Sequence, residues 1–270
     1  MDALFIIKTY CLLDDTLKLM GHCDHHHAII STAEILTVGI IAAKYFQNHH
    51  ERTLYVLCQL GYLPHMSMSR FNRRWHQAWN LLTEMLDYWS GQRVTVSHYV
   101  VDAMPVPVCR MYYADQCRKI PQTSGYIGRN AAKKQWFCGW RLHWVCDIEG
   151  FPIAFDLVPA LWHELTPLQL LLTSLPEGSS LFGDGAYISR EHEILAFLGG
   201  IRLIPERHMQ MNHQNPEWQM LKLKHYRAKI ESQHGVLESM GVQRLRAVTP
   251  AGFALKVYAS LAVLAVNLMD

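Results

Sequence analysis

The pattern of apolar residues changes at Gly91, and this change constrains the fold more than any other feature of the sequence. Before it the apolar residues follow helical spacing, with a capping-box start at Ser31–Glu34. After it, residues 94–101 are mostly β-branched or aromatic, as in a strand. The sequence therefore predicts an all-helical region over residues 1–90 and a sheet-containing domain over residues 91–270.

Spacing and turn residues divide both regions further. We expect helices over residues 31–45, 51–60, 69–89, 167–175, 191–198, 217–240 and 251–268. We expect strands over residues 94–101, 136–147, 153–157, 180–182 and 201–204. Residues 110–135 lack periodicity and predict a mobile loop. Strands first, then strand–helix alternation, predict an α/β fold with a mixed sheet and flanking helices.

Composition alone does not indicate a nucleic-acid partner, because the net charge of the 270-residue chain is only +2. The basic residues are nevertheless grouped. Residues 129–141 hold four basic and no acidic side chains, and residues 222–246 hold six basic and two acidic ones. Two such islands indicate a localised surface for a polyanion, although two solvated helix faces would give the same pattern.

Cysteine usage and the ends of the chain bear on its compartment. The seven cysteines include no Cys-x-x-Cys pair, and we recognise no secretory leader at the start. We therefore expect reduced thiols and a cytoplasmic protein. The apolar run 251–268 approaches membrane length, but Lys256 and Asn267 interrupt it. We expect a buried helix there and no membrane partner.

Three acids occupy positions suited to metal-dependent chemistry. Asp102 follows the first strand, Asp184 follows a later strand between two glycines, and Glu231 lies within a helix. Carboxylates from two strand ends and a helix can converge on two divalent cations, and oxygen ligands suit Mg²⁺. Taken singly, each has an ordinary explanation: a turn before Pro105, an Asp-Gly turn, and an exposed helical charge.

The segments that carry these acids resemble a known family. The strand ending in Asp102, the stretch 181–187 and the stretch 227–231 resemble the three acid motifs of DDE transposases with a ribonuclease H-like fold. The resemblance is greatest to the insertion-sequence 982 family, whose N-terminal segments match Ser31–Glu34 and Phe71-Asn72-Arg73-Arg74. It spans residues 31–268.

The resemblance implies an enzyme that cuts DNA at the terminal inverted repeats of its element and joins the ends to target DNA. Asp102, Asp184 and Glu231 would be its catalytic residues and would bind two Mg²⁺ ions, for which Mn²⁺ can substitute. Because an element has two ends, the resemblance also implies a homodimer or larger assembly on DNA.

The sequence departs from the broader transposase signature around the third acid. The signature has Tyr seven residues before this acid and Lys seven after it, whereas Lys224 and Glu238 stand there. Only Arg227, four residues before Glu231, matches. Glu238 is a rival third acid, since it shares a helix face with Arg227, Glu231 and His234. We favour Glu231 because of the preceding Arg227.

Several further residues are candidates for accessory roles. His163 and Glu164 precede a helix, where they would lie near the metal site or simply cap the helix. His234 and Glu238 accompany Glu231 on its helix. The tract Cys23–His27 contains metal-ligand residue types, but it lacks two well-separated ligand pairs and is better explained as a solvated loop.

Basic residues in two places predict DNA contacts. Arg70, Arg73 and Arg74 open a helix and suit phosphate contacts, although a charged face beside a buried tryptophan stripe would look the same. The other candidates are Lys133, Lys134 and Arg227. Trp136 and Trp140 either stack on an unpaired base or pack in the core.

Three other functions fit parts of this pattern. A ribonuclease H-like nuclease would cleave DNA without joining it. A domesticated or inactive derivative would bind DNA without cutting it, and the Glu238 departure points in that direction. A helical metal-binding protein would use the histidine tract.

Overall fold

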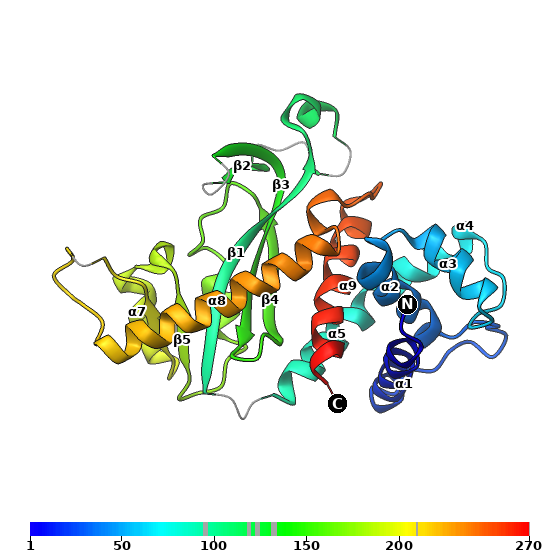
Figure 1. The fold of residues 1–270 in the computed structure, drawn as a ribbon, viewed down its shortest axis with the longest axis horizontal. Helices are drawn as coiled ribbons and strands as arrows, with labels where there is room; N and C mark the ends of the chain where they lie inside the picture. The colour runs from blue at the N-terminus through cyan, green and yellow to red at the C-terminus, as the bar shows by residue number, and fades with distance from the viewer. Residues whose placement is uncertain (94–96, 118–119, 122–124, 131–133, 209, 270) are drawn as a thin grey trace. The chain divides into compact units, whose positions relative to one another are not determined.

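The computed structural model describes residues 1–93, 97–117, 120–121, 125–130, 134–208 and 210–269 (Figure 1). The chain forms two compact units, one of residues 1–88 and 237–270 and the other of residues 89–236. The expected division after residue 90 placed the whole C-terminus with the sheet. Instead, the last 34 residues belong with the N-terminal helices, because the C-terminal helix buries its apolar side chains against them.

The first unit is all-helical. Its elements are α1 (Ala3–Leu19), α2 (Thr32–Phe46), α3 (His50–Gln59), α4 (Met68–Gln77), most of α5 (Trp79–Gly91), the 3-10 turn η3 (Val242–Arg244) and α9 (Pro250–Leu268). The central helix is α2, which contacts α1, α3, α4 and α9. The predicted capping box is present: the Ser31 hydroxyl accepts from the Glu34 amide at 3.1 Å, and the Glu34 carboxylate accepts from the Ser31 amide.

The helix predicted over residues 69–89 is two helices that meet at Ala78. The Ala78 amide still donates to the Arg74 carbonyl at 3.0 Å, and the Leu82 amide donates to the Ala78 carbonyl. The hydrogen-bond ladder and the apolar spacing therefore run through the break, so the sequence pattern does not reveal it.

Close packing in this unit depends on Gly39 of α2. A Cβ atom added there would lie 2.1 Å from Cη2 of Trp75 on α4, so only glycine lets the indole approach this closely. His50 completes the cluster. It is 5% exposed, and its ring makes edge contacts with Phe71 and Trp75 at centroid distances of 5.1 and 5.4 Å.

Helix α9 supplies much of the core of this unit. Within the described part of the chain, it is the one helix long and apolar enough to cross a membrane. Most of its residues are buried, and it packs on α2. Its apolar character is therefore accounted for by packing within the unit, as expected for a helix that closes a core.

The second unit contains one six-stranded sheet. Its strands are β1 (His98–Cys109), β2 (Ile127–Asn130), β3 (Gln135–Asp147), β4 (Pro152–Pro159), β5 (Ser180–Gly183) and β6 (Arg202–Pro205). The order is β2-β3-β1-β5-β6, with β4 also paired to β3. Strands β1, β3 and β4 are antiparallel neighbours, whereas β5 and β6 run parallel to β1. This is a mixed sheet, as the sequence predicts.

Helices accompany the sheet. They are α6 (Leu168–Leu172), α7 (Arg190–Leu198) and α8 (Glu217–Ser239), with short 3-10 turns η1 (Met111–Gln116) and η2 (Gly185–Tyr187). Figure 1 shows α8 crossing one face of the sheet. Side chains of α8 contact β1 through Lys222 and His98, and β3 through His234 and Trp144.

Two predictions about the strands were wrong. Asp102 does not end the first strand, because β1 pairs with β3 as far as Cys109. The segment 110–135, expected to be a loop, contains η1 and the edge strand β2 within its described residues. Part of the first predicted strand, residues 94–96, lies outside the described residues.

Burial of His50 predicts an acid-sensitive helical unit. Burial lowers the pKa of His50 to about 3, helped by the charges of Lys256, His49 and His76. The folded-state pKa lies below the unfolded value near 6.5, so stability is present above pH 6.5 and is lost as the pH falls below it. Between pH 6.5 and 5 we expect His50 to cost up to about 2 kcal/mol of unfolding free energy.

Chemical denaturation at several pH values measures this loss. His50→Leu should flatten the slope between pH 6.5 and 5, whereas His26→Leu, at an exposed loop histidine, should keep it. Equal slopes in wild type and His50→Leu would show that another group is responsible.

Candidate active site

Three acids meet at the edge of the sheet formed by β1, β5 and β6. In the β1–β5 register Val100 pairs with Phe182, so Asp102 and Asp184 stand at corresponding positions two residues further along. Gly183 pairs with Pro205 in the β5–β6 register, and the Glu206 amide donates to the Gly183 carbonyl at 2.9 Å. Parallel strands in register therefore bring Asp102, Asp184 and Glu206 side by side.

A fourth carboxylate comes from α8 with a guanidinium beside it. Arg227 donates one hydrogen bond to Glu206 and another, of 3.2 Å, to Glu231 one turn further along the helix. Partial burial lowers the pKa of Arg227, but nearby carboxylates outweigh it and raise the pKa overall: Glu206, Glu231, Asp102 and Asp184. The guanidinium thus lies within reach of all four negative charges.

Asp102 is the acid most strongly affected by its surroundings. Its side chain is 19% exposed, and its Oδ1 accepts from the Ala103 amide at 2.7 Å. Burial raises its pKa to about 7; the charges of Asp184 and Glu231 add to this rise, while Arg227 opposes it. A carboxyl that is held near other carboxylates and away from water has little to stabilise its charge.

Asp184 is fixed by the turn that follows β5. Its Oδ1 accepts from the Ala186 amide at 2.9 Å and caps η2. Burial raises its pKa, Arg227 lowers it, and Glu164 and Glu206 raise it. The preceding Gly183 is required by space, since a Cβ atom there would lie 2.9 Å from the buried Tyr187 ring.

The donor set of this site fits a hard divalent cation. Oxygen ligands from carboxylates are those that Mg²⁺ prefers. The pKa of Asp102 is raised first by burial and further by the charges of Asp184 and Glu231, so a cation beside it would favour its ionised form. Among the residues described, no group of three or more His, Cys, Asp or Glu side chains is already arranged to hold a metal ion. The carboxylates would have to close further around an ion.

The rival third acid follows Glu231 on the same helix. Glu238 is seven residues beyond Glu231 on α8, about 10.5 Å along the helix, and falls in the other compact unit. Its carboxylate accepts from the side-chain amide of Gln243. Glu231, in contrast, is among the charges that raise the pKa of Asp102.

His234 extends towards Asp102 from the same helix. Its Nδ1 lies 3.9 Å from Asp102 Oδ2, and its Nε2 accepts from the Trp144 indole at 2.9 Å. Burial lowers the pKa of His234 to about 4, so the ring is neutral near physiological pH.

The remaining predicted residues of the sheet unit have varied surroundings. Glu164 pairs with Arg141 and adds negative charge at Asp184. His163 is exposed, and its Nδ1 accepts from the Leu165 amide at 3.3 Å, as a cap would. Lys134 is exposed at the start of β3; Lys133 lies outside the described residues.

The two tryptophans of β3 also differ. Trp136 is 62% exposed and open to a ligand, whereas Trp140 packs edge-on against Tyr126 at a centroid distance of 4.8 Å.

In the helical unit, the arginines of α4 are not equivalent. Arg70 and Arg73 are exposed and line a groove of about 500 Å³ together with His27 and His65. Arg74 also borders this groove, but it donates to the Ile30 carbonyl and to Asp24 Oδ1, the latter at 3.2 Å.

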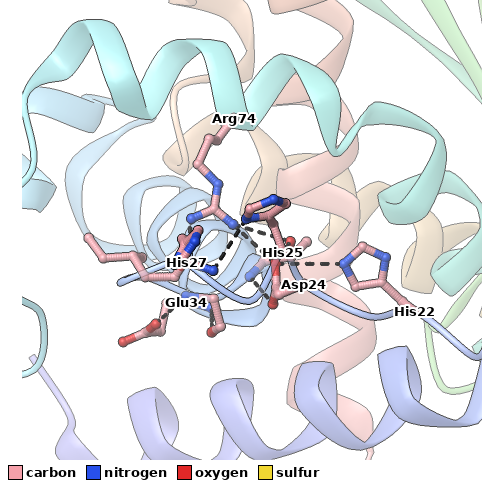
Figure 2. Close-up of polar contacts among 9 residues, drawn as sticks. His22, Asp24, His25, His27, Glu34 and Arg74 are labelled. Atoms are coloured by element: carbon pink, nitrogen blue, oxygen red, sulfur yellow. Dashed lines mark hydrogen bonds and ion pairs between the residues drawn. The ribbon is translucent and has the colours of Figure 1, made fainter.

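Figure 2 shows Asp24 at the centre of this contact, where it also accepts two hydrogen bonds from Thr32. The rings of His25, His26 and His27 lie against one another with centroid distances from 4.0 to 5.6 Å. Among the residues described, no metal-binding group includes them. Arg74 thus ties the histidine loop to α4.

Sequence reasoning missed Glu206. The signal was available, because Glu206 directly follows a short apolar strand just as Asp184 does. The sequence does not show that β5 and β6 are neighbouring strands, and it is this pairing that places Asp184 beside Glu206.

A mixed sheet with a carboxylate cluster at the ends of its parallel strands suits metal-dependent chemistry. Residues 96–268 match the family model for the transposase DDE domain, and the chain belongs to this family. It is therefore a transposase-type enzyme of the polynucleotidyl transferase class.

Comparisons with other proteins add little. Two solved structures that align with the chain are "Mos1 transposase paired-end complex with left transposon end" and "Crystal structure of a pre-cleavage Mos1 transpososome". Both are 11% identical; the TM-scores are 0.27 and 0.25, with 82% and 84% of this chain and 81% and 82% of those chains covered. Likeness at these TM-scores supports no conclusion. The sequence has no match among curated proteins.

The acid cluster is expected to lower the unfolding free energy of the metal-free protein. Because the folded-state pKa of Asp102 is above the unfolded value of 3.8, ionised Asp102 destabilises the fold, fully so above pH 7. Asp102→Asn should raise the unfolding free energy of the metal-free protein by up to about 4 kcal/mol at pH 8, and the gain should fade as the pH falls towards 4.

Thermal or urea unfolding in a chelating buffer measures this gain. Glu177→Gln changes an exposed carboxylate of the same unit and should have little effect. A loss of stability in Asp102→Asn at pH 8 would contradict the electrostatic description of the site.

Proposed function

We propose that this enzyme cuts DNA at the two ends of its own insertion element and joins the freed 3′-hydroxyls to target DNA. The observation that carries the proposal is the convergence of Asp102, Asp184 and Glu231 around Arg227. Within the transposase DDE-domain family, the motifs Ser31–Glu34 and 71–74 support membership of the insertion-sequence 982 family. The reduced thiols expected from the sequence suit action in the bacterial cytoplasm.

We infer that the three acids would hold two Mg²⁺ ions, or Mn²⁺ in their place. When bound, such ions activate a water or a 3′-hydroxyl and stabilise the leaving oxygen of a phosphodiester. Asp102 and Asp184 are the ligands expected to be shared, and Glu231 completes one of the two sites. The Glu206 carboxylate also pairs with Arg227 and would hold the guanidinium in place once Glu231 binds an ion.

Arg227 has two consecutive tasks in this proposal. In the metal-free protein it offsets the charge of the acids. Once Glu231 takes up its role as a ligand, the Nη2 group that now contacts it is available to donate to a DNA phosphate. This agrees with the DNA-binding role predicted for Arg227.

We propose that the groove beside α4 contacts the phosphate backbone of the element end. Arg70 and Arg73 are its exposed guanidiniums, and His27 and His65 add polar donors. Lys134 and the exposed Trp136 are a second contact region. Because an element has two ends, we expect two or more copies of the chain on DNA.

A plasmid-nicking assay tests the catalytic part. With Mg²⁺ and a plasmid carrying the DNA that flanks the reading frame, wild type should nick and then join strands. Asp184→Asn should reduce nicking about 100-fold or more, because it removes a metal-binding charge. Nicking without joining would indicate a nuclease, and binding without nicking would indicate an inactive derivative.

The same assay distinguishes the two candidate third acids. Glu231→Gln should abolish metal-dependent nicking with little change in DNA binding, since the substitution keeps size and removes charge. Glu238→Gln, the matched control on the same helix, should keep most of the nicking. The reverse result would identify Glu238, two helical turns further along, as the third acid.

DNA-binding isotherms at several salt concentrations test the α4 groove. Arg70→Ala with Arg73→Ala should weaken binding and reduce the salt slope by about two, since each arginine removed takes away one phosphate partner and about one unit of slope. Arg74→Ala should mainly lower stability, by about 1–2 kcal/mol, because it frees Asp24 and the Ile30 carbonyl. An unchanged slope in the double variant would limit this helix to a packing role.

A further inference from the structure

Trp144, Asp102 and His234 meet on one face of the sheet. Trp144 of β3 pairs directly with Asp102 of β1, and residues opposite each other in antiparallel strands direct their side chains to the same face. Helix α8 brings His234 to this face with its side chain 16% exposed. Trp144 is fully buried, so it provides a rigid support for what contacts it.

The hydrogen bond between Trp144 and His234 fixes the tautomer of the histidine. An indole N–H can only donate, so His234 Nε2, which receives it at 2.9 Å, carries no proton. In a neutral ring the proton must then be on Nδ1. This is the nitrogen that faces Asp102 Oδ2 at 3.9 Å.

The two oxygens of Asp102 have different surroundings. Oδ1 accepts from the Ala103 amide at 2.7 Å and is therefore held by the strand itself. Oδ2 faces the Nδ1–H of His234 across a gap that is too long for a hydrogen bond. A shift of about 1 Å by either side chain would close this gap and fix the plane of the carboxylate from both sides.

We propose that His234 is a positioning residue, held by Trp144, which donates its Nδ1–H to Asp102 and orients that carboxylate for the divalent cation. The inference rests on the proposed function, because the cation belongs to it. A neutral donor suits this task, since it fixes direction without adding a positive charge that would repel the ion. Loss of a residue that hydrogen-bonds a metal ligand typically lowers metal affinity 10- to 100-fold.

The position of His234 on α8 supports this role. Arg227, Glu231 and His234 follow one another at steps of four and three residues, so one helix face presents all three to the acids of the sheet. Arg227 balances charge, Glu231 supplies a ligand, and His234 directs a ligand of β1.

Mn²⁺ titration followed by electron paramagnetic resonance tests the inference without DNA or turnover. His234→Leu should weaken Mn²⁺ binding about 10-fold or more. His234→Asn should recover most of the affinity, because the asparagine amide nitrogen takes the place of Nδ1 and can donate. His225→Leu, at an exposed histidine of the same helix, is the matched control and should bind as wild type does.

Nitrogen NMR of the histidine rings gives a second readout that needs no metal. Wild-type His234 should show the Nδ1–H tautomer, and Trp144→Phe should lose this preference. The inference is overturned if folded His234→Leu binds Mn²⁺ as tightly as wild type, or if wild-type His234 carries its proton on Nε2. Failure of wild type itself to bind Mn²⁺ would instead contradict the proposed metal site, while the tautomer would still report on the Trp144 contact.

Discussion

The balance between a group of carboxylates and the single guanidinium of Arg227 governs this site. Two adjacent parallel strand pairings place Asp102, Asp184 and Glu206 side by side. Burial and the charges of neighbouring carboxylates oppose the ionisation of Asp102 and Asp184. Arg227 offsets part of this charge by pairing with Glu206 and with Glu231 of its own helix. An arrangement that costs stability when empty of cations is what a cation-binding centre requires, since the binding free energy then comes partly from relief of repulsion.

Helix α8 supplies the remaining side chains of the site. Its residues at steps of four and three face the acids, and the indole of Trp144 anchors it to β3. The sheet fixes the backbone positions of two acids, while the helix supplies the third together with a counter-charge and an oriented donor. In the helical unit, Gly39 of α2 allows the Trp75 ring to pack closely. Arg74 has a structural role there, because it donates to the Ile30 carbonyl and to Asp24.

Much of the fold follows from local pattern, because β-branched runs, capping residues and Gly turns act over a few residues. The mixed sheet and the Ser31–Glu34 capping box were predictable in this way. Features that depend on contacts between distant segments were not. Strand β1 continues past Asp102 because β3 pairs with it. Glu206 can be recognised as a neighbour of Asp184 only from the register of β6 with β5. The membership of α9 in the helical unit likewise depends on its packing against α2.

The most direct test of the central claim is a crystal structure of the protein soaked with Mn²⁺, with the ion located by its anomalous signal. We predict a peak coordinated by Asp102, Asp184 and Glu231, with Arg227 no longer paired to Glu231. A protein that holds no ion there at millimolar Mn²⁺, with the Arg227–Glu231 contact intact, would contradict the account.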